Sequence, residues 1–138
     1  MEKLLQKTLI MGIIKNDDSI LMRKKFLGAK PYKETWYSFG CELSGGNSPK
    51  DLFIDYIYDY LGINISFSRY LSWDTEIKED HDGVIKRFVY LDLEMNYVSG
   101  EIKIPGGLEE IGWISKEDLK DIDIVPPSVE MFKKYKYL

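Results

Sequence analysis

The residues on which most redox and nucleophilic sites depend are scarce in this sequence. Among its 138 residues there is one cysteine, Cys41, and one histidine, His81. A single cysteine excludes an internal disulfide and suits a reducing cytosol. The sequence also has no CxxC pair, no phosphate-binding P-loop motif and no serine nucleophile-elbow motif. The signatures of dithiol redox proteins, P-loop nucleotide hydrolases and serine hydrolases are therefore missing.

Long apolar runs and an excess of positive charge are missing as well. The apolar stretch near the start, Leu9 to Ile14, is only about six residues long, whereas a membrane-spanning helix needs about 20. It is not followed by the small-residue cleavage site of a signal peptide. The formal net charge of −4 gives no general attraction to nucleic acid or to an anionic membrane. These features predict a cytoplasmic protein with no membrane segment and argue against a nucleic-acid partner.

The composition is otherwise that of an ordinary globular chain. Apolar residues make up 44% and charged residues 30% of the sequence. Ten Tyr, six Phe and three Trp residues supply large side chains for a core. At this length the simplest organisation is one domain that covers residues 1–138.

Apolar periodicity predicts strands and helices in a mixed order. A β-hairpin is expected at the start, because two apolar stretches flank an Asn-Asp-Asp turn. The predicted strands are 8–14, 19–22, 36–39, 65–73, 84–95 and 111–114, and the predicted helices are 49–61, a short one after Ser115, and 128–135. Few strand–helix–strand units occur, so the fold class is α+β or an α/β sandwich with a mixed sheet.

The central helix has start and stop signals at both ends. Ser48 is a candidate N-cap, Pro49 suits the first helical position, and Asp51 completes a capping box. Gly62 is placed to end the helix. A glycine-bearing loop precedes this helix, and a helix that begins after such a loop can offer free N–H groups to an anion.

Basic residues follow the predicted hairpin. Arg23, Lys24 and Lys25 come directly after its second strand, and Lys30 and Lys33 continue the same loop. Such a run forms either a solvated face or an anion contact.

Together these features resemble the Nudix superfamily, the MutT-like hydrolases, over nearly the whole chain. The resemblance is carried by the hairpin that ends in Arg23, by Trp36-Tyr-Ser-Phe-Gly40, by the loop and helix that close on Leu61-Gly62-Ile63, and by Glu109-Glu110-Ile-Gly-Trp113. It implies a Nudix-type α/β/α sandwich with a mixed β-sheet. Dimers are common in this family, so a homodimer is an open expectation.

The family's sequence box, G-x5-E-x7-R-E-U-x-E-E-x-G-U with U a bulky aliphatic residue, fits in length without a gap. Its glycine stop and its helix are retained, whereas most of its charged residues are replaced. Cys41 falls on the first Gly, Asn47 on the isolated Glu, Asp55 on the Arg, Tyr56 on the next Glu, Asp59 and Tyr60 on the Glu pair, and Gly62-Ile63 on the closing Gly-U. Only Asp59 keeps an acid where the family has a metal-binding Glu.

The resemblance implies hydrolysis of a nucleoside diphosphate linked to another moiety, with Mg²⁺ or Mn²⁺ as cofactor. Mg²⁺ prefers carboxylate oxygens, and a neutral phenol with a pKa near ~10 is a poor replacement. The remaining catalytic candidates are therefore Asp59, also the candidate metal ligand, with Glu109 or Glu110. Arg23 resembles the family residue that contacts a phosphate.

Several residues have two interpretations. Tyr56 and Tyr60 are candidate substrate contacts that stack on a base or fill the emptied metal site, or they pack into the core. Arg23 contacts a phosphate or is an ordinary arginine at a strand end. His81 is a general base or an exposed loop residue.

Two functions remain open at the level of sequence. The first is a Nudix-type hydrolase whose pyrophosphohydrolase activity is weak or absent. The second is a non-catalytic module on the same fold that binds a nucleotide-like small molecule or a partner protein.

Overall fold

The computed structural model describes residues 3–25, 35–106 and 108–138. The predicted basic positions Lys30 and Lys33 lie outside these ranges. Lys25 and Glu109 lie in strands whose backbone alone is described at these two positions.

One mixed β-sheet forms the centre of the molecule. Its strands are β1 (Leu5–Asn16), β2 (Ser19–Lys25), β3 (Trp36–Tyr37), β4 (Phe39–Glu42), β5 (Asn64–Glu79), β6 (Ile85–Ser99) and β7 (Leu108–Ser115). The order along the sheet is β3-β2-β1-β6-β5, with β4 also paired to β1 and β7 to β2. The β1–β6 pair is parallel and the other pairs are antiparallel, so the sheet is mixed as predicted.

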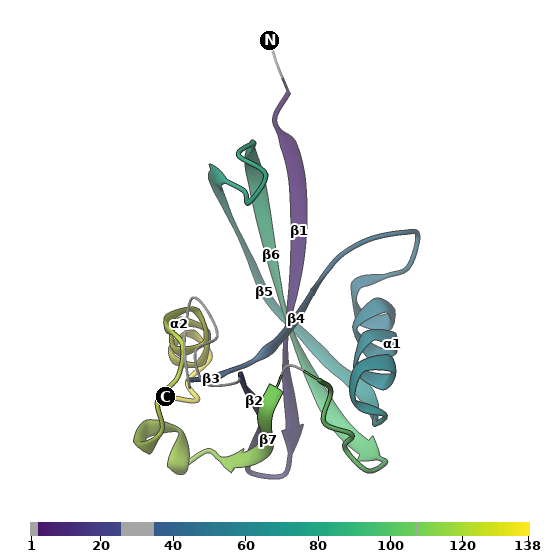
Figure 1. Cartoon of the computed structure of the whole chain (residues 1–138), viewed down its shortest axis with the longest axis vertical. Helices are drawn as coiled ribbons and strands as arrows, with labels where there is room; N and C mark the ends of the chain where they lie inside the picture. Colours follow the sequence, from purple (N-terminus) through teal and green to yellow (C-terminus); the bar gives the residue numbers. More distant parts are fainter. Residues whose placement is uncertain (1–2, 26–34, 107) are drawn as a thin grey trace.

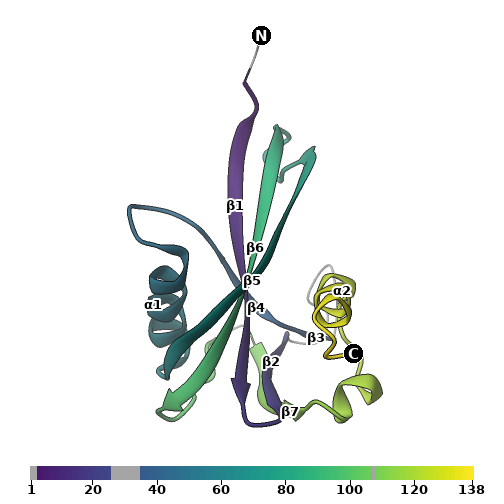
Figure 2. The same ribbon diagram turned by 180° about the vertical axis from the view of Figure 1, so that it is seen from behind.

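Two helices cover opposite faces of this sheet. Helix α1 (Pro49–Leu61) lies on one side and helix α2 (Pro126–Lys134) on the other, with the strands between them (Figures 1 and 2). A single turn of 3-10 helix, Asp118–Asp121, follows β7, where the sequence predicted a short helix. The predicted α/β/α sandwich is confirmed. None of the helices in the described part of the chain is long and apolar enough to cross a membrane.

The strands β5 and β6 extend further than their composition predicts. The sequence indicated a strand that ends at Trp73, but β5 continues to Glu79 and remains paired with β6 as far as Ile85. The added residues, Asp74–Glu79, are mostly charged, so they show no strand pattern of their own. They adopt strand geometry because β6 supplies their hydrogen-bonding partners.

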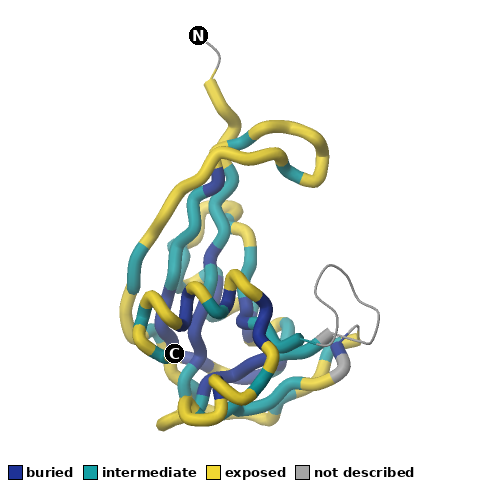
Figure 3. Tube along the Cα trace, turned by 90° about the vertical axis from the view of Figure 1, so that its left-hand side faces the viewer, coloured by how far each residue is buried: buried dark blue, intermediate teal, exposed yellow. Residues whose placement is uncertain are grey.

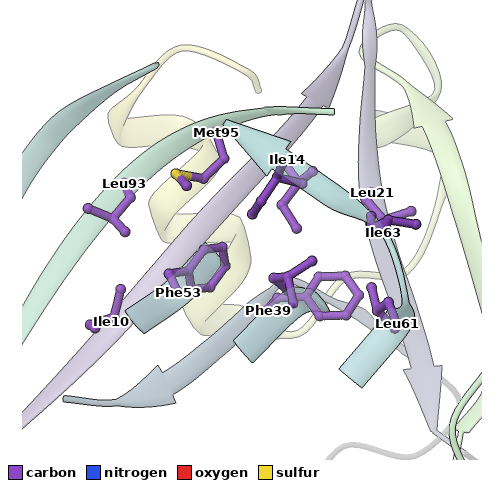
Figure 4. Packing of buried hydrophobic residues seen from close by; sticks show 11 residues of the cluster. Ile10, Ile14, Leu21, Phe39, Phe53, Leu61, Ile63, Leu93 and Met95 are labelled. Carbon is purple, nitrogen blue, oxygen red and sulfur yellow. The ribbon is translucent and has the colours of Figure 1, made fainter. Parts of the chain in front are cut away.

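The core is divided into two clusters by the sheet. The larger cluster lies between α1 and the sheet, where Phe53, Ile57 and Leu61 of the helix are fully buried. Figure 4 shows Phe53 and Leu61 among the other residues of this cluster. The smaller cluster lies under α2 and includes Met131 and Phe132. The buried segments gather in the body of the molecule, whereas the end that carries the N-terminus is mostly exposed or half-buried (Figure 3).

The ends of α1 follow the predicted signals. The Ser48 side chain accepts a hydrogen bond from the backbone N–H of Asp51 at 3.4 Å. Gly62 has a φ of 78° and donates its N–H to the carbonyl of Tyr58. This left-handed conformation has no steric cost for glycine. The two caps fix where α1 begins and ends.

Candidate functional site

Aromatic rings surround the guanidinium group of Arg23 near the end of β2. The guanidinium carbon lies 4.4 Å from the ring centroid of Tyr37, 4.6 Å from that of Phe39 and 5.7 Å from that of Tyr60. A cation within about 6 Å of a ring centroid is attracted by the negative face of the π system. Two of these rings come from β3 and β4 and one from α1, so three elements hold one cation.

Hydrogen bonds orient the same guanidinium group. Its Nε donates to the backbone carbonyl of Ser38 at 3.2 Å, and Nη1 donates to the Tyr56 hydroxyl at 3.4 Å. Among the carboxylates whose side chains the structure describes, none forms an ion pair with Arg23. The positive charge is therefore positioned by rings and neutral oxygens.

The two tyrosines of α1 form one unit with Arg23. Tyr56 and Tyr60 are one helical turn apart, and their rings stack at 5.5 Å with an interplanar angle of 11°. Burial raises the pKa of the Tyr56 hydroxyl, although the charge and hydrogen bond of Arg23 act in the opposite direction. Tyr56 is therefore a neutral phenol at physiological pH.

Of the predicted acidic ligands, Asp59 and Glu110 form no ion pair with Arg23, and the side chain of Glu109 lies outside the described part of the structure. Asp59 is exposed on α1 and has no hydrogen-bond or ion-pair partner among the residues that the structure describes. Glu110 is exposed and is paired with Lys24 of β2. Because side chains alternate along a strand, Glu110 lies on the opposite face of β7 from Ile111 and on the same face as Ile114. That face carries the α2 cluster, whereas Ile111 packs on the α1 cluster. The register thus directs Glu110 away from the sheet face that α1 covers.

The donor set beside α1 does not fit a divalent metal ion. Among the residues whose side chains the structure describes, which do not include Glu109, no group of three or more His, Cys, Asp or Glu side chains could hold one. The helix positions nearest to Arg23 present neutral hydroxyls, and Mg²⁺ binds preferentially to carboxylates and phosphates. The Mg²⁺ or Mn²⁺ cofactor that the box resemblance implies therefore has no matching first ligand sphere at Tyr56 and Tyr60.

A cleft of about 540 Å³ opens beside Arg23. Most of its wall is apolar, and a few polar groups converge on it, which is the usual make-up of a small-molecule site. Its lining residues come from β1, the β2–β4 region, the β5–β6 turn and the start of α2: Leu9, Met11, Arg23, Tyr37, Ser38, Gly40, Cys41, Glu42, His81, Val125, Pro127 and Ser128.

Two buried serines join the walls of this cleft. The backbone N–H of Ser38 donates to Ser128 Oγ at 3.2 Å, and the two hydroxyl oxygens are 3.1 Å apart. Both residues are almost fully buried. Because Ser38 follows β3 and Ser128 belongs to α2, this pair fixes α2 against the strands that hold Arg23.

The β5–β6 turn brings His81 to the cleft. Asp80 accepts hydrogen bonds from Lys86 at 2.8 Å, from Lys7 of β1 at 3.2 Å and from the His81 backbone N–H at 2.8 Å. These contacts tie the turn to β1. His81 itself is exposed, so its side chain lines the rim of the cleft.

Cys41 lines the same cleft and is half-buried. Burial raises the pKa of its thiol, which keeps it protonated at neutral pH. A protonated thiol is a weak nucleophile, so Cys41 forms part of the wall.

Sequence reasoning named Arg23, Tyr56 and Tyr60 but missed the rings and serines that surround them. Tyr37 and Phe39 alternate along the strands after Arg23, and this period-2 pattern places them on related faces. This alternation in the sequence could have indicated that Tyr37 and Phe39 lie near each other. The serine pair joins residues 90 positions apart and left no local signal.

Comparison with solved structures identifies the fold. The chain is similar to a MutT protein from Methanosarcina mazei Go1 (TM-score 0.72, 13% identity, 99% of this chain and 96% of that chain covered). It is similar to a MutT Nudix hydrolase from Burkholderia pseudomallei (TM-score 0.67, 19% identity, 93% and 96% covered). It is also similar to the Nudix domain of NrtR from Shewanella oneidensis, solved in complex with ADP ribose (TM-score 0.65, 10% identity, 99% and 88% covered).

The chain thus has the Nudix fold, as the sequence resemblance predicted. No family model matches the sequence, and no curated protein matches it either. At these identities the likeness defines the fold alone.

Proposed function

We propose that this chain is a single Nudix-fold domain that binds a nucleotide-like small molecule in the cleft beside Arg23, with weak or absent pyrophosphohydrolase activity. The observation that carries the proposal is the packing of Tyr56 and Tyr60 against Arg23. The helix face that would have to present carboxylates to a metal ion presents two neutral phenols instead.

The shape and chemistry of the cleft support a ligand with two unlike ends. Leu9, Met11 and Val125 offer an apolar surface, and Arg23 offers a planar cation at one side. A guanidinium group matches the geometry of phosphate oxygens. A nucleoside linked to phosphates has such a pair of ends. The ADP ribose bound by the NrtR Nudix domain is a ligand of this kind.

The first test separates binding from hydrolysis. Thermal melting of the protein with a panel of nucleoside diphosphate derivatives measures binding, because a ligand of the native state raises the melting temperature. Phosphate release from the same panel with Mg²⁺ or Mn²⁺ measures turnover. We expect stabilisation by at least one compound and no turnover above background.

Asp59→Asn tests the competing metal-dependent enzyme, in which Asp59 acts with Glu109 or Glu110. Asp55→Asn is the matched control, because Asp55 is exposed one turn earlier on α1. We expect both variants to behave like the parent protein. Turnover that disappears in Asp59→Asn and survives in Asp55→Asn would establish the enzyme instead. No stabilisation by any member of the panel would refute nucleotide binding.

A further inference from the structure

We infer that Arg23 supplies the positive charge for an organic diphosphate bound in this cleft, so that the diphosphate binds without a divalent cation at the neighbouring Tyr56 and Tyr60 of α1. This inference rests on the proposed binding function and specifies how the negative charge of the ligand is balanced. Arg23, Tyr56 and Tyr60 carry it.

The guanidinium group is fixed but not neutralised. Its Nε and Nη1 atoms are engaged by the Ser38 carbonyl and the Tyr56 hydroxyl. Among the side chains that the structure describes, Nη2 has no hydrogen-bond acceptor and no carboxylate pairs with the charge. A cation that is positioned in advance and still has donors to offer is suited to an incoming anion.

Three aromatic rings hold the guanidinium group in place. The rings of Tyr37, Phe39 and Tyr60 lie against the guanidinium group and stabilise it through their π faces. They restrict its rotation without using its charge for an ion pair. Ligand binding therefore does not have to restrict the Arg23 side chain further, which lowers the entropic cost of binding.

The same arrangement disfavours a metal ion at the tyrosines. A divalent cation bound at the Tyr56 hydroxyl would lie close to Arg23 Nη1, which is 3.4 Å from that oxygen. The two positive charges would repel each other, and no carboxylate among the described side chains forms an ion pair with Arg23 to offset the repulsion. Tyr56 and Tyr60 thus act as positioning residues for Arg23.

The cleft selects the class of anion. Arg23 and Tyr37 border its wall together with apolar residues of β1, so an anion at Arg23 can keep an attached apolar group inside the cleft. Inorganic phosphate would use only the cation. An organic diphosphate such as ADP would use both.

The test measures ADP binding by calorimetry in EDTA and again with Mg²⁺ in excess. We expect the affinity in EDTA to equal or exceed that in Mg²⁺, because Mg²⁺ competes for the phosphates. In EDTA, Arg23→Gln should weaken ADP binding by about 10- to 100-fold, which is typical for the loss of hydrogen bonds to a charged group. Arg23→Lys should recover only part of it, because lysine lacks the planar fork.

Arg87→Gln is the matched control, because Arg87 is an exposed arginine of β6 that does not line the cleft, and it should bind ADP like the parent protein. ADP binding that needs Mg²⁺ would overturn the inference and leave the proposed binding function intact. No binding of ADP or of any other nucleotide in either buffer would overturn both. The EDTA comparison on the parent protein decides the matter even if the Arg23 variants fold poorly.

Discussion

Tyr56 and Tyr60 show how two side chains change the chemistry that a helix face can support. Residues four apart on a helix lie on the same side, so two acids at these positions would face a common cation. Two tyrosines at the same spacing instead stack on each other, while Tyr56 accepts a hydrogen bond from Arg23 and the Tyr60 ring lies near the guanidinium group. The backbone of α1 is unaffected, because its ends are set by the Ser48 and Gly62 caps.

A second residue-scale feature concerns Gly12, where β1 passes under α1. A Cβ added at Gly12 would overlap the ring of Phe53, which is fully buried. Gly12→Ala should therefore force Phe53 out of position and lower the free energy of unfolding by about 1–3 kcal/mol, as overpacking of a core does. Urea denaturation measures the change.

Gly46→Ala is the control, because a Cβ at Gly46 meets nothing within 4 Å. It should leave the unfolding midpoint almost unchanged. Equal midpoints for the two variants would contradict the packing of Phe53 on Gly12.

At the scale of elements, the position of α2 depends on a short buried contact. Ser128→Ala removes the oxygen that accepts from the Ser38 N–H and leaves that donor buried without a partner. An unsatisfied buried group costs about 1–3 kcal/mol. We expect a loss of stability of this size, with faster amide exchange in β3 and at the start of α2.

Ser44→Ala serves as the comparison, because Ser44 is exposed in the loop before α1. It should show neither effect. A parent-like exchange rate at Ser38 in Ser128→Ala would mean that the serine contact does not hold α2 in place.

The elements differ in how far the sequence predicts them. Helix α1 was predicted to the residue, because its caps and its apolar spacing are local properties. The end of β5 was missed, because Asp74–Glu79 is a strand only through pairing with β6. In the site, Arg23, Tyr56 and Tyr60 were named individually. Their contact depends on tertiary packing between β2 and α1, which no local pattern encodes.

At the scale of the whole molecule, several carboxylates make folding sensitive to acid. Hydrogen bonds from Lys86 and from the His81 backbone hold the pKa of Asp80 well below its usual range. Burial alone would raise the pKa of Glu94, but Lys15 and Arg69 together lower it. A lowered folded-state pKa contributes stability above the unfolded-state pKa, which is about 4. That stability is lost as the pH falls toward the folded-state value.

We therefore expect the urea midpoint to be steady near neutral pH and to fall as the pH is lowered from about 5 to about 3. Asp92 acts in the opposite direction, because burial raises its pKa, and its protonation offsets part of the loss. Asp80→Asn should make the urea midpoint fall less steeply between about pH 5 and about pH 3. Asp121→Asn, at an exposed position of the 3-10 turn, should leave this fall unchanged. If the urea midpoint of Asp80→Asn falls as steeply with pH as that of the parent protein, the Asp80 contacts of the β5–β6 turn do not cause the acid sensitivity.

The two prolines at the start of α2 remove backbone hydrogen-bond donors from one end of the cleft. Pro126 and Pro127 have no backbone N–H, and the N–H of Ser128 already donates to the carbonyl of Val125 at 3.0 Å. The N–H of Val125 is likewise bonded, to a backbone carbonyl of β3. The start of this helix, which would otherwise attract an anion, therefore has no donor left in its first turn. The backbone at this end of the cleft therefore offers an anion no N–H donor, whereas the Arg23 side offers a guanidinium group.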